Sequence, residues 1–264
     1  MGAGHQRPGA DGGFLLIMDR FPHARAGPGG STELLAAWGR GRNAQPWEQA
    51  MVLLVDLVGS EDLSTFTRMD VGNRDWTLLA LHLELFGGSL DATSTCPSCV
   101  QEVEARLSVE TFLELTTNDR PDDGWLTLVY GPHEYRLRLP TSEDLAAVVG
   151  LDPVEARQVL LSRCVPDIGE SATRDPALEA AVVERMAQAD PCADIVLALL
   201  CPVCDDSWRV SFDITVFLWR ELDAWAHRVL GDVQRLAGAY GWSEREILDL
   251  PPWRRQYYAE SLGA

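Results

Sequence analysis

Apolar residues recur every three or four positions through much of the chain, and this spacing predicts a largely helical protein. In the first third it predicts helices over residues 34–42, from Pro46 onward and over residues 73–86. Proline suits the first turn of a helix, and the glycines at 87 and 88 suit the end of one. We therefore expect residues 31–88 to form a small helical domain.

A second helical region is predicted at the end of the chain, over residues 215–264. One apolar face steps from Leu218 to Leu236, which is typical of a long amphipathic helix, and Gly238 and Gly241 are expected to break that helix. Ser243 and Glu246 have the spacing of a capping box and predict the start of a short helix. A last helix is expected after the two prolines at 251 and 252.

Apolar and polar residues alternate on both sides of two Cys-Pro-x-Cys sequences, which begin at residues 96 and 201, and alternation predicts strands. Residues 90–113 align with residues 195–218 at a constant offset of 105 without any gap. Each copy is expected to form a strand, a tight turn, a strand and the start of a helix. This internal repeat predicts paired, zinc-ribbon-like hairpins over residues 89–114 and 194–214.

The segment between the two copies, residues 115–193, is predicted to contain a further hairpin followed by helices. Its strands are expected over residues 125–130 and 135–139, and its helices begin near Thr141, Pro153 and Pro176. Residues 1–30 hold eight glycines and three prolines and are expected to form a flexible extension. The expected fold class is α+β.

Four cysteines are the candidate metal ligands: Cys96, Cys99, Cys201 and Cys204. Two residues between paired cysteines allow both thiolates of one turn to reach the same tetrahedral ion, and two such turns complete a shell of four sulfurs. The chain therefore predicts one structural Zn²⁺ with no open position for water. A redox role for one pair and two local disulfides are the alternatives.

The other two cysteines, Cys164 and Cys192, have no paired spacing and are expected to be buried thiols. The five histidines form no metal-binding or triad spacing, and no nucleophile elbow, zinc-protease helix or phosphate loop is present in the sequence. We therefore expect the protein not to be an enzyme.

The formal net charge is −18, and all 22 basic residues are arginine. General nucleic-acid binding is not expected, because a surface that follows a phosphate backbone needs a basic stripe. No apolar run approaches the roughly 20 residues of a membrane span, and no secretory signal is recognised. We therefore expect a cytoplasmic protein, at least where it is made.

Candidate partner-binding residues gather near the end of the chain, where aromatic side chains flank a short helix. Aromatic residues and arginine are enriched in the energetically dominant parts of protein interfaces. The set is Tyr240, Trp242, Glu246, Trp253, Arg254, Arg255, Tyr257 and Tyr258.

Several short sequences in residues 31–262 together resemble a known family. They lie at residues 35–41, 46–54, 71–75, 78–87, 138–145, 217–222 and 236–248, together with both Cys-Pro-x-Cys turns. They resemble the baseplate-associated proteins encoded with phage-tail-like contractile injection systems, a group related to the T-even phage baseplate hub assembly family. The most specific part is Tyr-Gly-Trp-Ser-Glu-Arg-Glu-Ile-Leu at residues 240–248.

The resemblance implies a structural or assembly role at the baseplate hub, without catalysis, and with hub, spike, tube or wedge proteins of the same particle as partners. The alternative that the residues leave open is a free-standing zinc-ribbon adaptor that binds other proteins, for example in transcription. The acidic charge disfavours direct contact with nucleic acid in that alternative as well.

Overall fold

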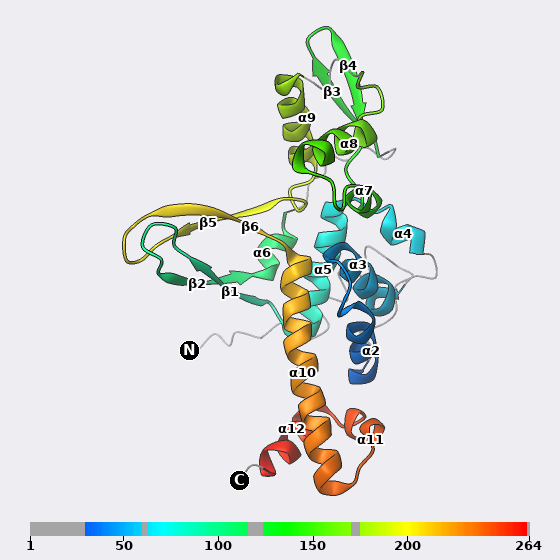
Figure 1. Cartoon of the computed structure of the whole chain (residues 1–264), viewed down its shortest axis with the longest axis vertical. Coiled ribbons are helices and arrows are strands. Elements are labelled where there is room, and N and C mark those ends of the chain that lie inside the picture. Colours follow the sequence, from blue (N-terminus) through cyan, green and yellow to red (C-terminus); the bar gives the residue numbers. More distant parts are fainter. Residues whose placement is uncertain (1–29, 60–62, 116–123, 170–174, 263–264) are drawn as a thin grey trace, which may run out of the picture. The chain divides into compact units, whose positions relative to one another are not determined.

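The computed structural model describes residues 30–59, 63–115, 124–169 and 175–262, and the extension predicted for residues 1–30 lies outside these ranges except for Gly30. The chain divides into two compact units. The first combines residues up to 61 with residues from 214 onward, and the second spans residues 62–213 (Figure 1). Residues 31–59 therefore lie in the first unit and residues 63–88 in the second.

The first unit is helical within its described residues. Its elements are α2 (Ser31–Gly41), α3 (Pro46–Leu53), the π-helix η1 (Leu54–Gly59), α10 (Ile214–Tyr240), α11 (Glu244–Leu248) and α12 (Pro252–Ser261). The predicted proline start of α3 is confirmed, and Gln45 with Glu48 adds a capping box that satisfies exposed amides. The π-helix has no sequence signal that we recognised, and it continues α3 without a break.

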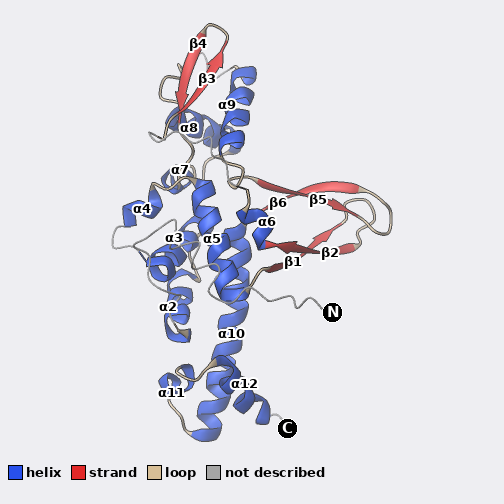
Figure 2. Ribbon diagram, turned by 180° about the vertical axis from the view of Figure 1, so that it is seen from behind, coloured by secondary structure: helices blue, strands red, loops and turns tan. Residues whose placement is uncertain are grey.

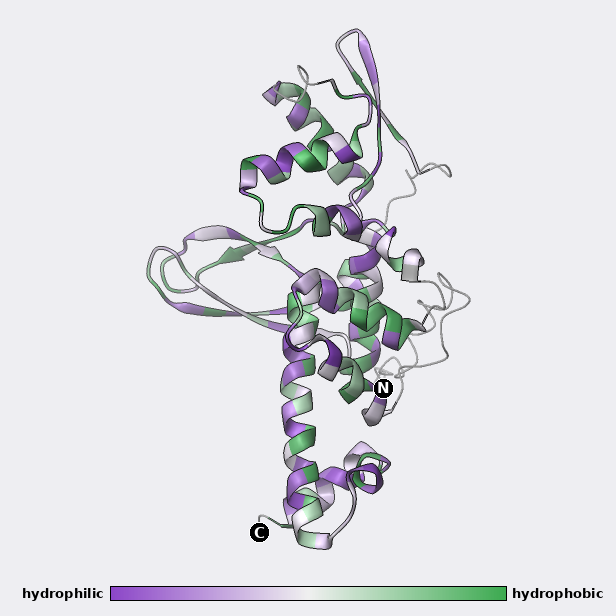
Figure 3. Ribbon diagram, turned by 45° about the vertical axis from the view of Figure 1, so that its right-hand side comes forward, coloured by the Kyte–Doolittle hydropathy of each residue, from purple (hydrophilic) through white to green (hydrophobic). Residues whose placement is uncertain are grey.

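Helix α10 is the long amphipathic helix that the apolar spacing predicts, and α2, α3, α11 and α12 pack against it. Leu218, Leu222 and Leu236 are buried on its inner face, and Figure 3 shows hydrophobic and hydrophilic residues interleaved along it. Gly41 of α2 lies so close to Trp219 that a Cβ atom there would overlap the indole ring. A glycine is therefore required where these two helices meet.

Of the two predicted helix breaks, the one at Gly241 is confirmed and the one at Gly238 is wrong. Helix α10 continues through Gly238 to Tyr240, and the chain leaves it at Gly241, whose φ is +70°. A glycine inside a helix costs about 1 kcal/mol relative to alanine, and the buried contacts of Leu236 in the same turn outweigh this cost. At Gly241 the left-handed backbone conformation itself ends the helix.

The second unit contains three antiparallel sheets of two strands each (Figure 2). Their strands are β1 (Ser89–Thr95) with β2 (Glu102–Ser108), β3 (Leu126–Tyr130) with β4 (His133–Leu137), and β5 (Ile195–Leu200) with β6 (Ser207–Phe212). Its described helices are α4 (Leu63–Thr67), α5 (Val71–Phe86), α6 (Val109–Leu113), α7 (Ser142–Ala147), α8 (Pro153–Cys164) and α9 (Pro176–Ala189). The mixture of helices and small antiparallel sheets agrees with the predicted α+β class.

The insert between the two repeat copies has its own hydrophobic core. Leu126 and Leu137 of the hairpin pack with Leu161 of α8 and with Leu178 and Val182 of α9. The predicted helix starts are confirmed: Thr141 forms a capping box with Asp144, while Asp152 and Asp175 cap α8 and α9. Period-two and period-3.6 patterns thus locate both kinds of element in this segment.

A buried carboxylate, Asp144, ties α7 and α8 to the end of β4. Its oxygens accept hydrogen bonds from Arg138, from Arg163 and from the backbone N–H of Thr141. Burial alone would raise the pKa of Asp144, but these donors outweigh burial and hold that pKa below its usual range. The carboxylate is therefore charged at neutral pH and holds both arginines in place.

Helix α5 is buried along most of its length, and a second carboxylate contacts its first turn. Asp190 accepts a hydrogen bond from the backbone N–H of Gly72 at 3.0 Å, next to the N-cap Asp70. A Cβ atom at position 72 would overlap the Asp190 carboxylate. Because anions are stabilised at helix N-termini, this contact anchors the segment before β5 to α5.

Candidate metal centre

The two Cys-Pro-x-Cys turns join the strands of two hairpins that have the same register. Leu90 pairs with Leu107 in the first hairpin, and Ile195 pairs with Phe212 at the equivalent place in the second. The offset of 105 between these pairs is the offset of the sequence repeat. The predicted internal repeat is therefore present in the backbone as well as in the residue pattern.

Each turn is closed by the same backbone hydrogen bonds. In the first, the amide of Cys96 donates to the carbonyl of Gln101 at 2.8 Å and the amide of Val100 donates to Cys96 at 3.0 Å. In the second turn, Cys201 donates to Asp206 at 2.8 Å and Asp205 donates to Cys201 at 3.1 Å. We call these two turns, residues 96–101 and 201–206, the knuckles.

The residue after the second cysteine of each knuckle has a left-handed backbone. The φ angle is +62° at Val100 and +58° at Asp205, and they are the two non-glycine residues with positive φ among those described. This conformation reverses the chain so that both thiols of a knuckle point to the same side. It is strained for any L-residue, and most of all for a β-branched one such as valine.

All four sulfur atoms lie within 4.8 Å of one another. The shortest separations join the knuckles: 3.6 Å from Cys96 Sγ to Cys204 Sγ and 3.5 Å from Cys99 Sγ to Cys201 Sγ. A disulfide would need about 2.05 Å, whereas sulfurs at the corners of a tetrahedron with 2.3 Å bonds to a central ion lie about 3.8 Å apart. The cysteines are free thiols placed as a candidate metal site.

Side chains from both hairpins support this site. Cys96 and Cys201 are fully buried and pack with Val103 and the partly buried Trp208, which occupy equivalent positions in the two copies. The indole N–H of Trp208 donates to Ser94 at 3.3 Å, and the hydroxyl of Ser98 donates to the carboxylate of Asp206. Both hydrogen bonds cross from one hairpin to the other, so they help to orient the two knuckles.

The thiols differ in their surroundings. Cys99 and Cys204 are exposed, so the sulfur cluster has a buried base and an open rim. The backbone N–H of Val203 lies 3.5 Å from Cys201 Sγ and, as a hydrogen-bond donor, lowers the pKa of that thiol to about 7. Because a metal binds the thiolate form, this backbone contact favours metal binding at neutral pH.

No further set of three or more His, Cys, Asp or Glu side chains comes together in this way within the described ranges. Cys164 and Cys192 are buried away from the knuckles, as predicted. Burial raises the pKa of Cys164 to about 11, and the thiol of Cys192 donates to the carbonyl of Leu115 at 3.0 Å. Both residues therefore act as core side chains.

The candidate partner-binding residues of the first unit divide into two groups. The rings of Tyr240, Trp242 and Tyr258 contact one another with centroids 4.7–6.1 Å apart: Tyr240 stacks on Trp242, and Tyr258 meets both rings edge to face. Trp242 and Tyr258 also pack against the small core between α10, α11 and α12. Arg255 is buried, donates to Ser31 at 3.2 Å and lies 3.8 Å from the carboxylate of Asp232.

Glu246 has a structural contact of its own, because its carboxylate accepts hydrogen bonds from the backbone and hydroxyl of Ser243. This predicted capping box is confirmed, and the hydrogen bonds lower the pKa of Glu246. The exposed members of the predicted set are Tyr240, Glu246, Trp253, Arg254 and Tyr257. These five are the part of the predicted set that a partner can reach directly.

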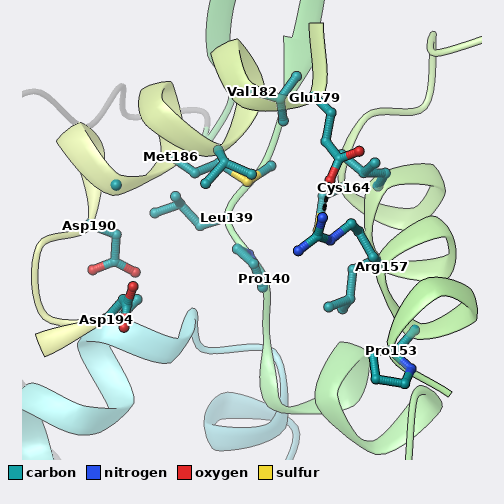
Figure 4. A pocket seen from close by; sticks show the side chains of 16 residues that line it. Leu139, Pro140, Pro153, Arg157, Cys164, Glu179, Val182, Met186, Asp190 and Asp194 are labelled. Carbon is teal, nitrogen blue, oxygen red and sulfur yellow. Dashed lines mark ion pairs between the residues drawn. The ribbon is translucent and has the colours of Figure 1, made fainter. Parts of the chain in front are cut away.

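Sequence reasoning missed a pocket of about 440 Å³ between α8 and α9 (Figure 4). Leu139, Val182 and Met186 line it, and an ion pair of 3.0 Å between Arg157 and Glu179 lies at its rim. The weak amphipathic spacing of α8 gave no signal for this pocket. Its walls are mainly aliphatic, which suits an apolar side chain better than a reacting group.

No protein-family model, curated protein or solved structure matches this chain. Among the helices of the described residues, none combines the length and apolar character that crossing a membrane would require.

Proposed function

We propose that this protein is a zinc-stabilised structural or assembly component of the baseplate hub of a contractile injection system, without enzymatic activity. The observation that carries the metal part of the proposal is the sulfur cluster, in which four thiols from two distant segments lie within 4.8 Å. The baseplate part rests on the sequence resemblance over residues 31–262, whose most specific segment covers α11 and its capping box.

Zinc is the metal that this donor set fits best. Soft thiolates select zinc, copper(I) or iron–sulfur clusters, and sulfur separations of 3.5 and 3.6 Å across the knuckles are close to those around one tetrahedral ion. Each cysteine pair on its own tight turn is also the usual arrangement in structural zinc sites. A second knuckle at 3.5 Å disfavours a separate redox role for either pair.

A site with four sulfur ligands supports binding to partners rather than catalysis. With every coordination position filled by the chain, the ion neither activates water nor polarises a substrate. What the ion supplies is rigidity, because it links residues 96–99 to residues 201–204 across the whole insert. A rigid support suits an adaptor that joins other proteins of a particle.

The proposal is tested by metal analysis together with particle assembly. We expect one Zn²⁺ per chain in protein purified under reducing conditions without chelator. We also expect a deletion strain to lack intact contractile particles, and wild-type protein supplied in trans to restore them. Cys164→Ala, which lacks a buried thiol outside the cluster, is supplied in trans as a control and should restore assembly as the wild-type protein does.

Intact particles in the deletion strain would contradict the baseplate role. If zinc is nevertheless bound, the free-standing adaptor becomes the better interpretation, and the proteins that co-purify would identify its setting. Absence of metal would contradict the structural-zinc proposal, and insulin reduction that disappears in Cys96→Ser would favour an oxidoreductase instead.

A further inference from the structure

The tip of the hairpin pair exposes aliphatic side chains around the sulfur cluster. Val100 is 76% exposed, Val203 66% and Leu200 62%, and the prolines at 97 and 202 are exposed as well. We call this set, Pro97, Val100, Leu200, Pro202 and Val203, the knuckle tip. An exposed group of large apolar residues on a folded surface is a recurrent mark of protein interaction sites.

These residues lie near one another at the turns of the two hairpins because the cysteines beside them converge. Val100 follows Cys99, Leu200 precedes Cys201 and Val203 precedes Cys204, and the cysteine sulfurs lie within 4.8 Å of one another. Figures 1 and 2 show the turns of the two hairpins side by side from opposite directions. Two segments about 100 residues apart in sequence thus contribute to the same exposed surface.

Val100 is the most informative member of the knuckle tip. Its φ of +62° is a conformation that glycine adopts freely and that a β-branched side chain opposes. With 76% of its surface exposed, the side chain gains little from packing within this chain. Valine therefore strains the knuckle with little compensating packing among the described residues, a combination that is typical of functional positions.

The charge around the knuckle tip indicates what kind of surface would bind there. Residues 95–104 and 200–207 contain four carboxylates, Glu102, Glu104, Asp205 and Asp206, and no basic residue. With four thiolates and one Zn²⁺, the proposed site itself would add a net charge of about −2. A second copy of this chain would bring a further −18, so the charges disfavour self-association.

We propose that the knuckle tip is a docking surface for a partner protein that presents an apolar patch surrounded by arginine and lysine. The inference rests on the proposed function and deepens it, because it names a surface through which the metal-stabilised hairpins contact a neighbour. The aliphatic side chains supply buried apolar area, and the carboxylates select the basic rim.

The test uses the full-length zinc-loaded protein and a defined probe. The probe is a fluorescent 18-residue amphipathic helical peptide with leucine on one face and lysine elsewhere, and its binding is followed by anisotropy. A peptide with glutamate in place of lysine and a lysine peptide without the leucine face are the probe controls. We expect the first peptide to bind and both controls to bind at least about ten-fold more weakly.

Val100→Gly separates binding from folding, because peptide binding should weaken while the stability of the fold does not fall. Removing the strained side chain should leave the metal content at one and the melting temperature unchanged or raised. Peptide binding should weaken by about ten-fold, since an exposed anchor is lost. Val203→Ser should weaken binding without affecting the backbone, and Val129→Ser, at a valine 71% exposed on β3, should change neither quantity.

Equal peptide binding by Val100→Gly, Val203→Ser and the wild-type protein would overturn the proposal. So would a lower melting temperature for Val100→Gly, which would assign Val100 to the fold. The assembly experiment tests the baseplate role independently of the docking proposal. If the deletion strain forms particles while the knuckle-tip variants lose the peptide, docking holds and the baseplate role does not.

Discussion

The paired hairpins and the insert between them are stabilised in different ways. The insert buries a cluster of eight residues from one hairpin and two helices, with six further apolar residues packed on it. The cluster beside the knuckles contains Cys96, Val103 and Cys201, with Trp208 packed against it. A lone two-stranded hairpin is marginally stable at best in water, so the proposed zinc would stabilise these hairpins, whereas apolar burial stabilises the insert.

This difference explains how 101 residues can separate Cys99 from Cys201 within one candidate metal site. The insert buries its apolar residues in its own core. Asp190 anchors the end of the insert to Gly72 before β5 begins. The insert can therefore fold without contacts from the hairpins, and the candidate metal site depends only on the four cysteines and the two turns that carry them. A long insertion is compatible with a small metal site when the insertion carries its own core.

The largest expected effect comes from removing a metal ligand. Cys201→Ser should abolish metal binding and leave residues 89–108 and 195–212 unprotected in hydrogen exchange, because the metal's free energy of binding stabilises those hairpins. Residues 126–189 should keep their protection. Cys164→Ala should instead lower protection in the insert and leave the metal stoichiometry at one. Protected hairpins in Cys201→Ser would show that the metal is dispensable.

The converse effect is expected from Asp144→Asn. This change leaves Arg138 and Arg163 without their shared carboxylate. Because both arginines are partly exposed and water can solvate them, we expect a cost of about 1.5–3 kcal/mol, the range for hydrogen bonds to a charged group. Denaturant unfolding followed by hydrogen exchange should show the loss in residues 126–189, with the metal content unchanged. Asp152→Asn, at an exposed helix cap, is the matched control and should cost well below that. Loss of metal from Asp144→Asn would contradict the independence of the two regions.

On acidification, the hairpins and the insert should lose their stabilising interactions at different pH values. The hairpins should lose their metal first, because protons compete for the thiolates, of which Cys201 has a pKa of about 7. The insert should persist further, since Asp144 has a folded-state pKa below its unfolded value of about 3.9. The stability that this carboxylate contributes is therefore present above about pH 4 and is lost as pH falls further. Metal release and exchange protection measured from pH 7 to pH 3 check this order.

The smallest expected effect concerns the second knuckle. Asp205→Gly should stabilise the zinc-loaded protein by at most about 1 kcal/mol, because relief of about 1–2 kcal/mol of left-handed backbone strain exceeds the entropic cost of glycine, about 0.5–1 kcal/mol. Asp205→Ala keeps a Cβ atom at positive φ and should not stabilise the protein. Thermal melts of the two variants under identical zinc concentrations distinguish them. A gain in Asp205→Ala equal to that in Asp205→Gly would mean that charge, rather than backbone strain, is the cause.

Much of the fold could be predicted from local patterns. The repeat at offset 105 predicted two equivalent hairpins, and prolines and capping residues predicted the starts of α3, α8, α9 and α11. These features depend on neighbours within a few residues, which is why sequence periodicity reveals them. The break predicted at Gly238 is wrong because packing of α10 outweighed an unfavourable helix propensity.

Features that depend on distant contacts could not be predicted in this way. Asp144 is one of 40 acidic residues, and nothing in its sequence setting indicates that Arg163 would reach it. Arg255 looks like a surface residue beside Arg254, yet it is buried against Ser31 and Asp232. The strain at Val100 and the pocket between α8 and α9 likewise arise from the folded backbone.

The amino-acid sequence by itself determined where the hairpins, most helix starts and the four candidate ligands lie, because spacing along the chain encodes local geometry. The repeat and the cysteine spacing also predicted that the two pairs converge, and the structure places the four sulfurs within 4.8 Å of one another. Only the tertiary structure decided that exposed aliphatic side chains lie beside them and that Asp144 and Arg255 are interior charges. Those features depend on contacts between residues far apart in the sequence, which no pattern of neighbouring residues encodes.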